Sequence, residues 1–210
     1  MTTRIPSRGS RKSQPGQPSD SKRRAPVQNR AKVTLDAIFE AAARILEREG
    51  RAGLNTNRIA ELAGVSIGTL YQYFRNKEEI LVAMARRQFD ADTEVALGAL
   101  QSASSANDEE PARQLIRVLI STYRQRRKTR RVAIDTLVAE GLSRERARAV
   151  NTVADAIRLL PEQRQSETAL FVITRAVNGV LRATIEEDSE LLGTREFEEE
   201  LVRLVRSYLA

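Results

Sequence analysis

Residues 65–79 read VSIGTLYQYFRNKEE, and this stretch decides how the rest of the chain is interpreted. The 210-residue chain holds only four Tyr and five Phe, and three of these nine, Tyr71, Tyr73 and Phe74, lie within four positions here. Hydrogen-bonding side chains stand between and around them. A helix that only filled a core would keep its aromatic and polar side chains on opposite faces. The mixture indicates a short helix with one packed face and one face left open.

Two short helices with a glycine between them account for this mixture. The segment NTNRIAELAGVSIGTLYQYF, residues 55–74, has helical spacing on both sides of Gly64, which favours a tight turn at that residue. Leu70 and Phe74 are four residues apart and are predicted to face the core. The rest of the second helix is then free to enter the major groove of DNA. The alternative is a surface turn with half-buried tyrosines, and the helical pattern around the segment favours the helix-turn-helix.

Helical periodicity continues from residue 31 to the C-terminus, and no strand pattern competes with it. Gly50 is expected to end the first helix, and Thr56 is expected to cap the second. A long helix is expected to begin at Asn76 and to reach about Leu100. The sequence therefore predicts an all-α protein of about nine helices.

The net charge of +7 is concentrated at the N-terminus. Residues 1–30 hold eight basic residues and one acidic residue, whereas the other 180 residues hold 27 of each. Four prolines and few large apolar residues in this segment predict a disordered basic arm. The arm is either a solubilising tail or a segment that contacts DNA phosphates or the minor groove. Two domains are expected to follow, at residues 31–92 with the motif at 55–74, and at residues 93–210.

The composition argues against catalysis, metal binding and membrane insertion. The chain has no cysteine and no histidine, so thiolate chemistry, the commonest general base and the commonest metal ligand are all missing. Asp92, Glu94 and Asp155 are scattered carboxylates that are expected to be solvated. No apolar run approaches the ~18 residues of a membrane span, and the basic N-terminus lacks the apolar region of a secretion signal. We expect a soluble cytoplasmic protein that is not an enzyme and that holds no metal or cofactor.

The residues around the motif resemble the DNA-binding domain of TetR-type transcriptional regulators. The resemblance rests on TLDAIFEAAARILEREG in the first helix and on TNRIAELAGVSIGTLYQYFRNKEEIL after it. Within the second segment, nearly every position of the family's motif is matched by the run Gly64-Val65-Ser66-x-Gly68-Thr69-Leu70-Tyr71-x-Tyr73-Phe74-x-x-Lys77. The similar region is about residues 31–92, under a third of the chain. It implies a three-helix DNA-binding domain, a palindromic operator in double-stranded DNA, a homodimer, and a larger helical domain for effector binding and dimerisation.

The resemblance also implies roles for individual residues. Many members of the family carry a basic residue where Asn57 stands, which leaves open whether Asn57 or its neighbour Arg58 contacts DNA. Gln72 is the best candidate for reading a base, because its amide can pair bidentately with adenine. The predicted DNA-binding residues are Thr56, Asn57, Arg58, Ser66, Ile67, Gly68, Thr69, Tyr71, Gln72, Tyr73 and Lys77.

The family resemblance places an effector pocket in the second domain, between about residues 100 and 187. Without histidine, cysteine or tryptophan, an apolar or amphipathic effector is favoured over a metal or haem. The alternative is that the inward-facing side chains form a solid core. The candidate lining residues are Leu119, Tyr123, Leu137, Val153, Ile157, Phe171 and Arg175.

A dimer interface is predicted on the last two long helices, of which the first is expected at residues 163–187. Small residues recur there at turn spacing and would let helices approach closely across a two-fold axis. The alternative is again that these faces are core within one subunit. The candidate interface residues are Ala176, Gly179, Val180, Ala183, Phe197, Leu201, Leu204, Val205 and Tyr208.

Two functions agree with these patterns. The first is a sequence-specific transcriptional regulator, a repressor that a small apolar or amphipathic effector releases from its operator. The alternative is a constitutive helical DNA-binding or nucleoid-associated protein without an effector. Similar affinity for all DNA sequences would favour the alternative.

Overall fold

The computed structural model describes residues 21–103, 111–159 and 164–209, and within these ranges every regular element is a helix. The predicted all-α class with about nine helices is confirmed for this part of the chain. In chain order the elements are α1 (Ser21–Glu49), η1 (Arg51–Gly53), α2 (Thr56–Ala63), α3 (Ile67–Tyr73), α4 (Lys77–Ala103), α5 (Pro111–Arg124), α6 (Arg127–Ala139), α7 (Ser143–Arg158), α8 (Glu167–Glu186), η2 (Glu190–Gly193) and α9 (Arg195–Leu209).

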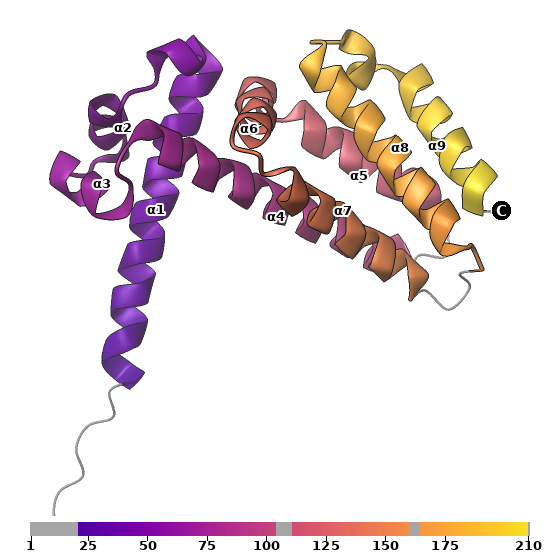
Figure 1. Cartoon of the computed structure of the whole chain (residues 1–210), viewed down its shortest axis with the longest axis horizontal. Helices are drawn as coiled ribbons and strands as arrows, with labels where there is room; N and C mark the ends of the chain where they lie inside the picture. Colours follow the sequence, from indigo (N-terminus) through magenta and orange to yellow (C-terminus); the bar gives the residue numbers. More distant parts are fainter. Residues whose placement is uncertain (1–20, 104–110, 160–163, 210) are drawn as a thin grey trace, which may run out of the picture.

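One long helix, α4, connects two bodies of helices (Figure 1). Helices α1, α2 and α3 lie at one end of the molecule, and α5 to α9 form a bundle at the other. Along its length α4 packs against α5, α6 and α7, while α8 packs against α7 and α9. The expected domain boundary at residue 92 falls inside α4. The two bodies therefore share a continuous helix rather than a linker.

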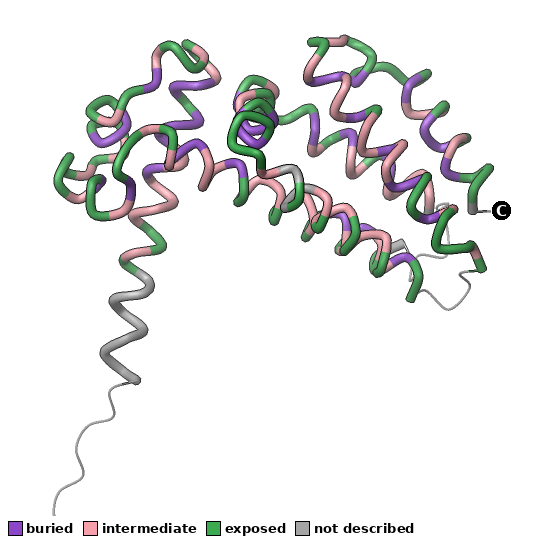
Figure 2. The backbone as a smooth tube through the Cα atoms, in the orientation of Figure 1, coloured by how far each residue is buried: buried purple, intermediate pink, exposed green. Residues whose placement is uncertain are grey.

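Each body has its own apolar core (Figure 2). In the N-terminal domain the core includes Ile38 of α1 and Leu70 of α3, both fully buried. Phe74 is buried in the same cluster, so the two core positions predicted for the second motif helix are confirmed. In the larger domain α5, α8 and α9 meet around side chains such as Leu181 and Val202. The two bodies are therefore packed around separate apolar clusters.

Glycines set the turns of the N-terminal domain where the sequence predicted them. Gly50 follows α1 with a φ of 66°, and Gly64 follows α2 with a φ of 67°, a left-handed conformation that other residues rarely adopt. The predicted cap of α2 is wrong by one residue. Asn55, not Thr56, is the N-cap, and its side chain accepts a hydrogen bond of 2.9 Å from the backbone N–H of Arg58.

The predicted disordered arm ends earlier than residue 30. Helix α1 begins at Ser21, so the last ten residues assigned to the arm are helical instead. Lysine, arginine, alanine and glutamine dominate this segment and favour a helix, which the prediction underrated beside Pro26. Residues 1–20, which carry the rest of the predicted arm, lie outside the described residues.

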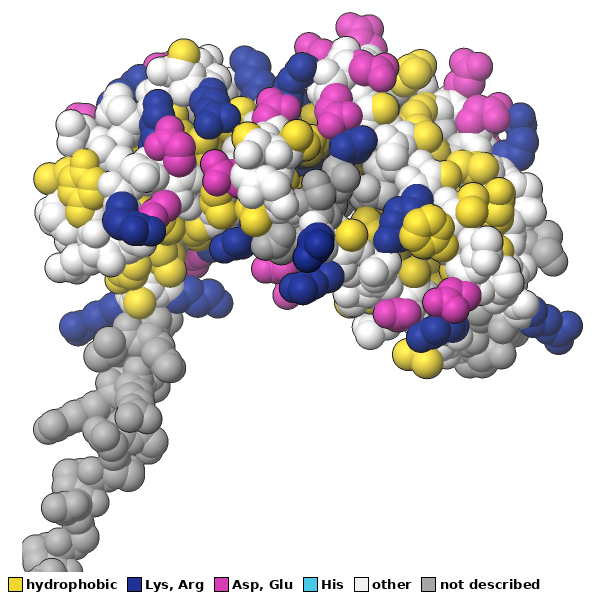
Figure 3. Space-filling view, viewed as in Figure 1, with side chains coloured by type: hydrophobic (Ala, Val, Ile, Leu, Met, Phe, Trp, Pro, Cys, Tyr) yellow, Lys and Arg dark blue, Asp and Glu magenta, His cyan; other side chains and the backbone are white. Residues whose placement is uncertain are grey.

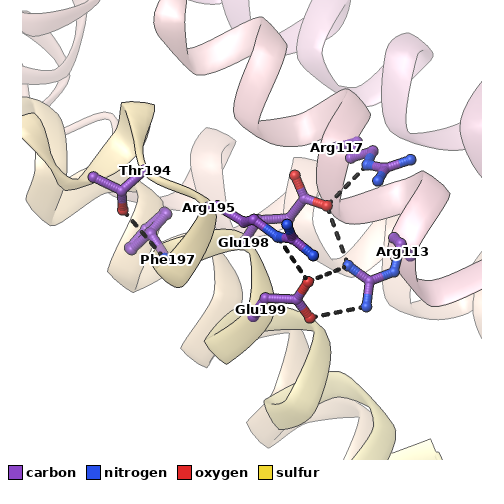
Figure 4. A network of polar contacts seen from close by, with 7 residues as sticks. All are labelled: Arg113, Arg117, Thr194, Arg195, Phe197, Glu198 and Glu199. Atoms are coloured by element: carbon purple, nitrogen blue, oxygen red, sulfur yellow. Dashed lines mark hydrogen bonds and ion pairs between the residues drawn. The ribbon is translucent and has the colours of Figure 1, made fainter.

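Charged side chains fix α9 against α5 (Figure 4). Arg113 donates hydrogen bonds to Glu199 at 2.9 and 3.0 Å and to Glu198 at 3.3 Å, and Arg117 donates to Glu198 at 2.8 Å. The Arg113 guanidinium holds the pKa of Glu199 below its ordinary value. Because much of this network is exposed, it is expected to orient the helices more than to stabilise them. Thr194 caps α9, where its Oγ1 accepts a hydrogen bond of 3.2 Å from the backbone N–H of Phe197.

Candidate functional site

The start of α3 is fixed by its own hydroxyl groups. Ser66 is the N-cap, and its Oγ accepts a hydrogen bond of 2.9 Å from the backbone N–H of Thr69. The hydroxyls of Ser66 and Thr69 lie 2.8 Å apart and are hydrogen-bonded to each other. Both residues were predicted to bind DNA, and the structure gives their hydroxyls a role in holding the N-terminus of α3. That N-terminus carries the positive end of the helix dipole, which favours a nearby phosphate.

The outer face of α3 presents both apolar and polar groups to solvent. Ile67, Gly68 and Gln72 are exposed, and Tyr71 is 51% exposed. The Tyr71 hydroxyl lies 3.3 Å from Oγ1 of Thr56, which joins the face of α3 to the first turn of α2. This arrangement explains the mixture of aromatic and polar residues in residues 65–79. The packed face holds Leu70 and Phe74, and the remaining side chains form a surface one helix wide.

Two predicted DNA-binding residues, Tyr73 and Arg58, also contact other parts of the N-terminal domain. Tyr73 is half-buried and packs against the N-terminal core. Arg58 forms a two-pronged ion pair with Glu49 at the end of α1, with one hydrogen bond of 2.6 Å, and this contact lowers the pKa of Glu49. The prediction left Asn57 and Arg58 as alternatives, and the ion pair favours Asn57, whose side chain is exposed. Lys77 is half-buried at the first turn of α4.

The larger domain contains an apolar cavity of about 190 Å³ between α4, α5, α7, α8 and α9. Four of the seven predicted pocket residues line it, namely Leu119, Tyr123, Val153 and Ile157. Side chains of α4 that face the same space include Ala96 and Leu100, which the prediction did not name. The cavity is smaller than the several hundred Å³ of a drug-sized site.

The other three predicted pocket residues lie elsewhere. Leu137 packs in a small cluster at the contact of α4 with α6. Phe171 is 56% exposed on α8, and the guanidinium of Arg175 stacks over its ring at 4.6 Å. Arg175 also donates a hydrogen bond of 2.6 Å to Asn151 of α7. The helical spacing of α8 was predicted correctly, but the prediction that Phe171 and Arg175 face the cavity was wrong. They lie on a face of α8 that points away from it.

One end of the cavity is polar and holds a buried ion pair. Asp92 of α4, expected to be solvated, accepts hydrogen bonds from both terminal nitrogens of Arg130 of α6, one of them at 3.1 Å. The Arg130 side chain is only 5% exposed, and it also donates to the carbonyl oxygen of Thr122 at 3.1 Å. Its guanidinium lies 4.4 Å from the ring centre of Tyr123. Asn178 of α8 donates a hydrogen bond of 3.3 Å to the Tyr123 hydroxyl.

Sequence reasoning missed Asp92, although α4 carries a signal for it. The positions before and after it that share its face, Ala85, Ala96 and Ala99, are all buried. A carboxylate in the middle of a buried stripe needs a cationic partner. The identity of that partner depends on how α6 crosses α4, which local periodicity does not predict.

The residue next to Arg130 contacts the N-terminal domain. Thr129 donates hydrogen bonds from its backbone N–H and its hydroxyl to Oε1 of Glu47 in α1, at 2.8 and 2.7 Å. A further ion pair of 2.7 Å joins Arg126 to Glu40, also in α1. The start of α6 therefore contacts two parts of the molecule. Arg130 belongs to the ion pair with Asp92 of α4, while Arg126 and Thr129 are bonded to α1.

One face of α8 is apolar and uncovered in the single chain. Phe171, Val172 and Val180 are exposed, and Figure 3 shows hydrophobic side chains gathered where Figure 1 draws α8. Gly179 lies among them, and a Cβ built on it would meet nothing within 4 Å. Among the described helices, α8 alone has the length and hydropathy of a membrane span, which is weak evidence because helices of soluble proteins share these properties.

Three predicted interface residues are core residues instead. Phe197, Leu201 and Val205 of α9 are buried within the larger domain, so they are not available to a partner. The remaining candidates are half-buried or exposed, which leaves Ala176, Gly179, Val180, Ala183, Leu204 and Tyr208.

Two family models match the chain. Residues 38–84 match the model of bacterial regulatory proteins of the tetR family, and residues 109–209 match that of the tetracyclin repressor-like C-terminal domain. The first covers α2 and α3, and the second covers all helices from α5 onward. Together they span most of the chain.

Curated relatives match over less than half of the chain. An HTH-type transcriptional regulator of Haemophilus influenzae is 43% identical over 60 residues, which is 28% of this chain and 32% of the relative. One from Mycobacterium tuberculosis is 32% identical over 95 residues, 45% of each protein. The chain thus matches less than half the length of either relative.

Solved structures match over most of the chain. A TetR-family transcriptional regulator from Mesorhizobium loti has a TM-score of 0.68 at 21% identity, covering 86% of this chain and 96% of the other. The multidrug binding protein EbrR complexed with ethidium has a TM-score of 0.61 at 20% identity, covering 84% and 99%. These likenesses concern the fold. Helix-turn-helix, family models and fold agree, and the chain belongs to the TetR family of transcriptional regulators.

Proposed function

We propose that the protein is a cytoplasmic repressor that binds a palindromic operator as a two-fold dimer and leaves it when a small molecule enters the cavity of the larger domain. The observation that carries this proposal is the continuity of α4. This helix begins at Lys77, directly after the recognition helix, and its later turns line the cavity through Asp92, Ala96 and Leu100. A ligand that displaces α4 would alter the separation of the two recognition helices, which must match successive major grooves roughly 34–36 Å apart.

Release requires a difference in affinity between two conformations. A ligand lowers operator affinity only if it binds the conformation that does not fit DNA more tightly than the one that does. The first turn of α6 supports a second route between the sites, because Thr129 is bonded to α1 and Arg130 to α4. One turn of α6 is thus hydrogen-bonded to both α1 and α4.

The test begins with an operator selected from random DNA by its binding to the full-length protein. A palindrome with half-sites one helical turn apart would support the proposal, and equal binding of all sequences would support the constitutive alternative instead. Compounds are then scored for their ability to lower affinity for that operator. A selected operator that no compound releases would leave sequence-specific binding without the effector.

Gln72 and Lys77 are expected to contribute to DNA binding in different ways. Gln72→Ala removes an exposed amide that can pair with a base, so it should relax discrimination at one operator position by about 1–3 kcal/mol. Lys77→Ala removes a positive charge at a helix start and should weaken binding to all sequences alike, with a smaller salt slope. Fluorescence anisotropy with the operator and with single-base variants distinguishes these results. The same sequence-independent loss for both substitutions would contradict the division of roles.

Thr129→Val is expected to weaken the coupling between effector and operator. It removes the hydroxyl that bonds Glu47 while keeping the side chain's shape. The ratio of operator affinities without and with effector should change by about 2- to 30-fold, the range found for coupling positions. Thr152→Val, on the exposed surface of α7, is the matched control. An unchanged ratio would mean that α6 does not communicate through α1.

A further inference from the structure

We propose that the cavity selects an uncharged molecule with a hydrocarbon body and one hydrogen-bonding head group, and that it discriminates against both cations and anions. This inference rests on the proposed function, because it names the class of effector that the regulatory cavity takes. The observations behind it are the pairing of every charge at the polar end, the hydrogen-bonding groups left there, and the volume.

The charges at the polar end of the cavity are already paired. Asp92 is the only charged side chain among the described residues of the lining. Its carboxylate accepts hydrogen bonds from both terminal nitrogens of Arg130 and, at 2.8 Å, from the amide of Gln88. A second guanidinium nearby, that of Arg182, lies 3.5 Å from the carboxylate of Glu186. The one charged side chain of the described lining therefore already has a guanidinium partner behind it, so this end of the cavity carries no net charge.

A charged head group would lose its water shell without gaining a free counter-ion. A cation would have to compete with Arg130 for Asp92, and an anion would have to compete with Asp92 for Arg130. Removing an ionised group from water is costly unless a partner compensates it. A neutral head group avoids this cost, so the paired site favours it.

Hydrogen-bonding groups remain for a neutral head group. Thr93 and Thr174 donate their hydroxyl hydrogens to carbonyl oxygens of their own helices, at 2.8 and 2.7 Å. The amide of Asn178 uses one of its hydrogens on the Tyr123 hydroxyl. An amide has a second hydrogen and a carbonyl oxygen, so Asn178 can both donate to and accept from a ligand. A hydroxyl or a carbonyl group of the ligand is the natural partner.

The volume sets the size of the body. An apolar cavity of about 150 Å³ takes benzene, so a cavity of about 190 Å³ takes a molecule of roughly eight non-hydrogen atoms. The surrounding walls are aliphatic side chains such as Leu115, Val150 and Val177. These side chains make dispersion contacts with a hydrocarbon body and offer it no charged partner.

Three probes with the same chain test the class, namely heptan-1-ol, heptanoate and heptylammonium. Isothermal titration of the full-length protein without DNA at pH 7 should show that heptan-1-ol binds at least about tenfold more tightly than either ion. Val153→Phe, which fills part of the cavity, should weaken heptan-1-ol at least about tenfold, whereas Val138→Phe on the surface of α6 should not. Equal or tighter binding of either ion, or no binding of heptan-1-ol, would overturn the proposal.

Replacing one member of the Asp92–Arg130 ion pair should change which of the three probes binds most tightly. In Asp92→Asn the guanidinium of Arg130 loses its carboxylate, and heptanoate should become the tightest of the three probes. Circular dichroism first establishes that this variant folds. If it does not, the comparison of the three probes on the unchanged chain and on Val153→Phe decides alone.

The operator experiment is separate from the binding experiment. Selective binding of heptan-1-ol with no effect on operator affinity would support the ligand class and refute release of the operator by ligands of this class. Operator release by an ion that binds more tightly than heptan-1-ol would support the proposed function and refute the ligand class. The two proposals therefore fail in different measurements.

Discussion

Replacing Val180 by glutamate should convert the proposed dimer into a folded monomer and lower its affinity for the operator by about 10²- to 10⁴-fold. Val180 is 39% exposed on α8 in the single chain, so a carboxylate there can reach water when the subunit is alone. At a two-fold axis the same substitution would place two like charges against an apolar face. The monomer keeps one recognition helix per molecule, and losing the second contact removes the gain from bivalent binding.

Sedimentation measures the oligomeric state of this variant, and anisotropy with the selected operator measures its affinity. Val138→Glu is the matched control, because Val138 is 60% exposed on a different helix, α6, and the substitution should leave both measurements unchanged. A Val180→Glu protein that remains dimeric and binds its operator normally would place the interface elsewhere. An unfolded variant would show instead that Val180 supports the subunit.

The apolar face of α8 supports this choice of interface over α9. Ala176, Gly179, Val180 and Ala183 follow one another at helical spacing and are half-buried or exposed. A glycine in a helix costs about 1 kcal/mol relative to alanine. No neighbour within the chain requires that glycine, since a Cβ at Gly179 has open space around it. A second helix that approaches closely across the axis would account for it.

The helices were predictable because each leaves a local pattern. Periodic apolar residues, Gly50, Gly64 and the spacing of Leu70 and Phe74 all act within one or two turns of their own position. The exposed face of α3 followed from that pattern, since Ile67, Tyr71 and Gln72 lie outside the packed stripe.

Core and interface faces could not be separated in the same way. Phe197 and Leu201 fill the subunit core, while Val180 faces outward, yet all three are large apolar residues at helical spacing. Burial against a neighbouring helix of the same chain and burial against a partner favour the same residue types. Only the packing of α9 on α5 and α8 distinguishes them, and it depends on contacts between residues far apart in the sequence.

Arg130→Met should lower the free energy of unfolding by about 3–5 kcal/mol. Methionine keeps much of the length and packing of the side chain but leaves Asp92, which is 15% exposed, without its cationic partner. It also removes the hydrogen bond to Thr122 and the contact over the Tyr123 ring. For a chain of this size the change corresponds to a fall in melting temperature of roughly 10 °C.

Two further variants separate the effect of the unpaired buried charge on stability from the effect of the lost packing. Thermal unfolding is followed at one fixed protein concentration, because the proposed dimerisation would raise the apparent stability of every variant. Arg131→Met, at the exposed neighbouring position of α6, is the control and should change the melting temperature little. The double variant Arg130→Met with Asp92→Leu removes both charges and should recover most of the loss, because an apolar pair can replace a buried ion pair at little cost.

A single variant as stable as the parent would show that Asp92 is solvated, and a double variant no better than the single would assign the loss to packing against Tyr123. Recovery in the double variant would show that the pair holds α4 and α6 together chiefly by compensating one buried charge with another. The cavity's neutrality, on which the proposed selectivity depends, would then also be a condition of the fold.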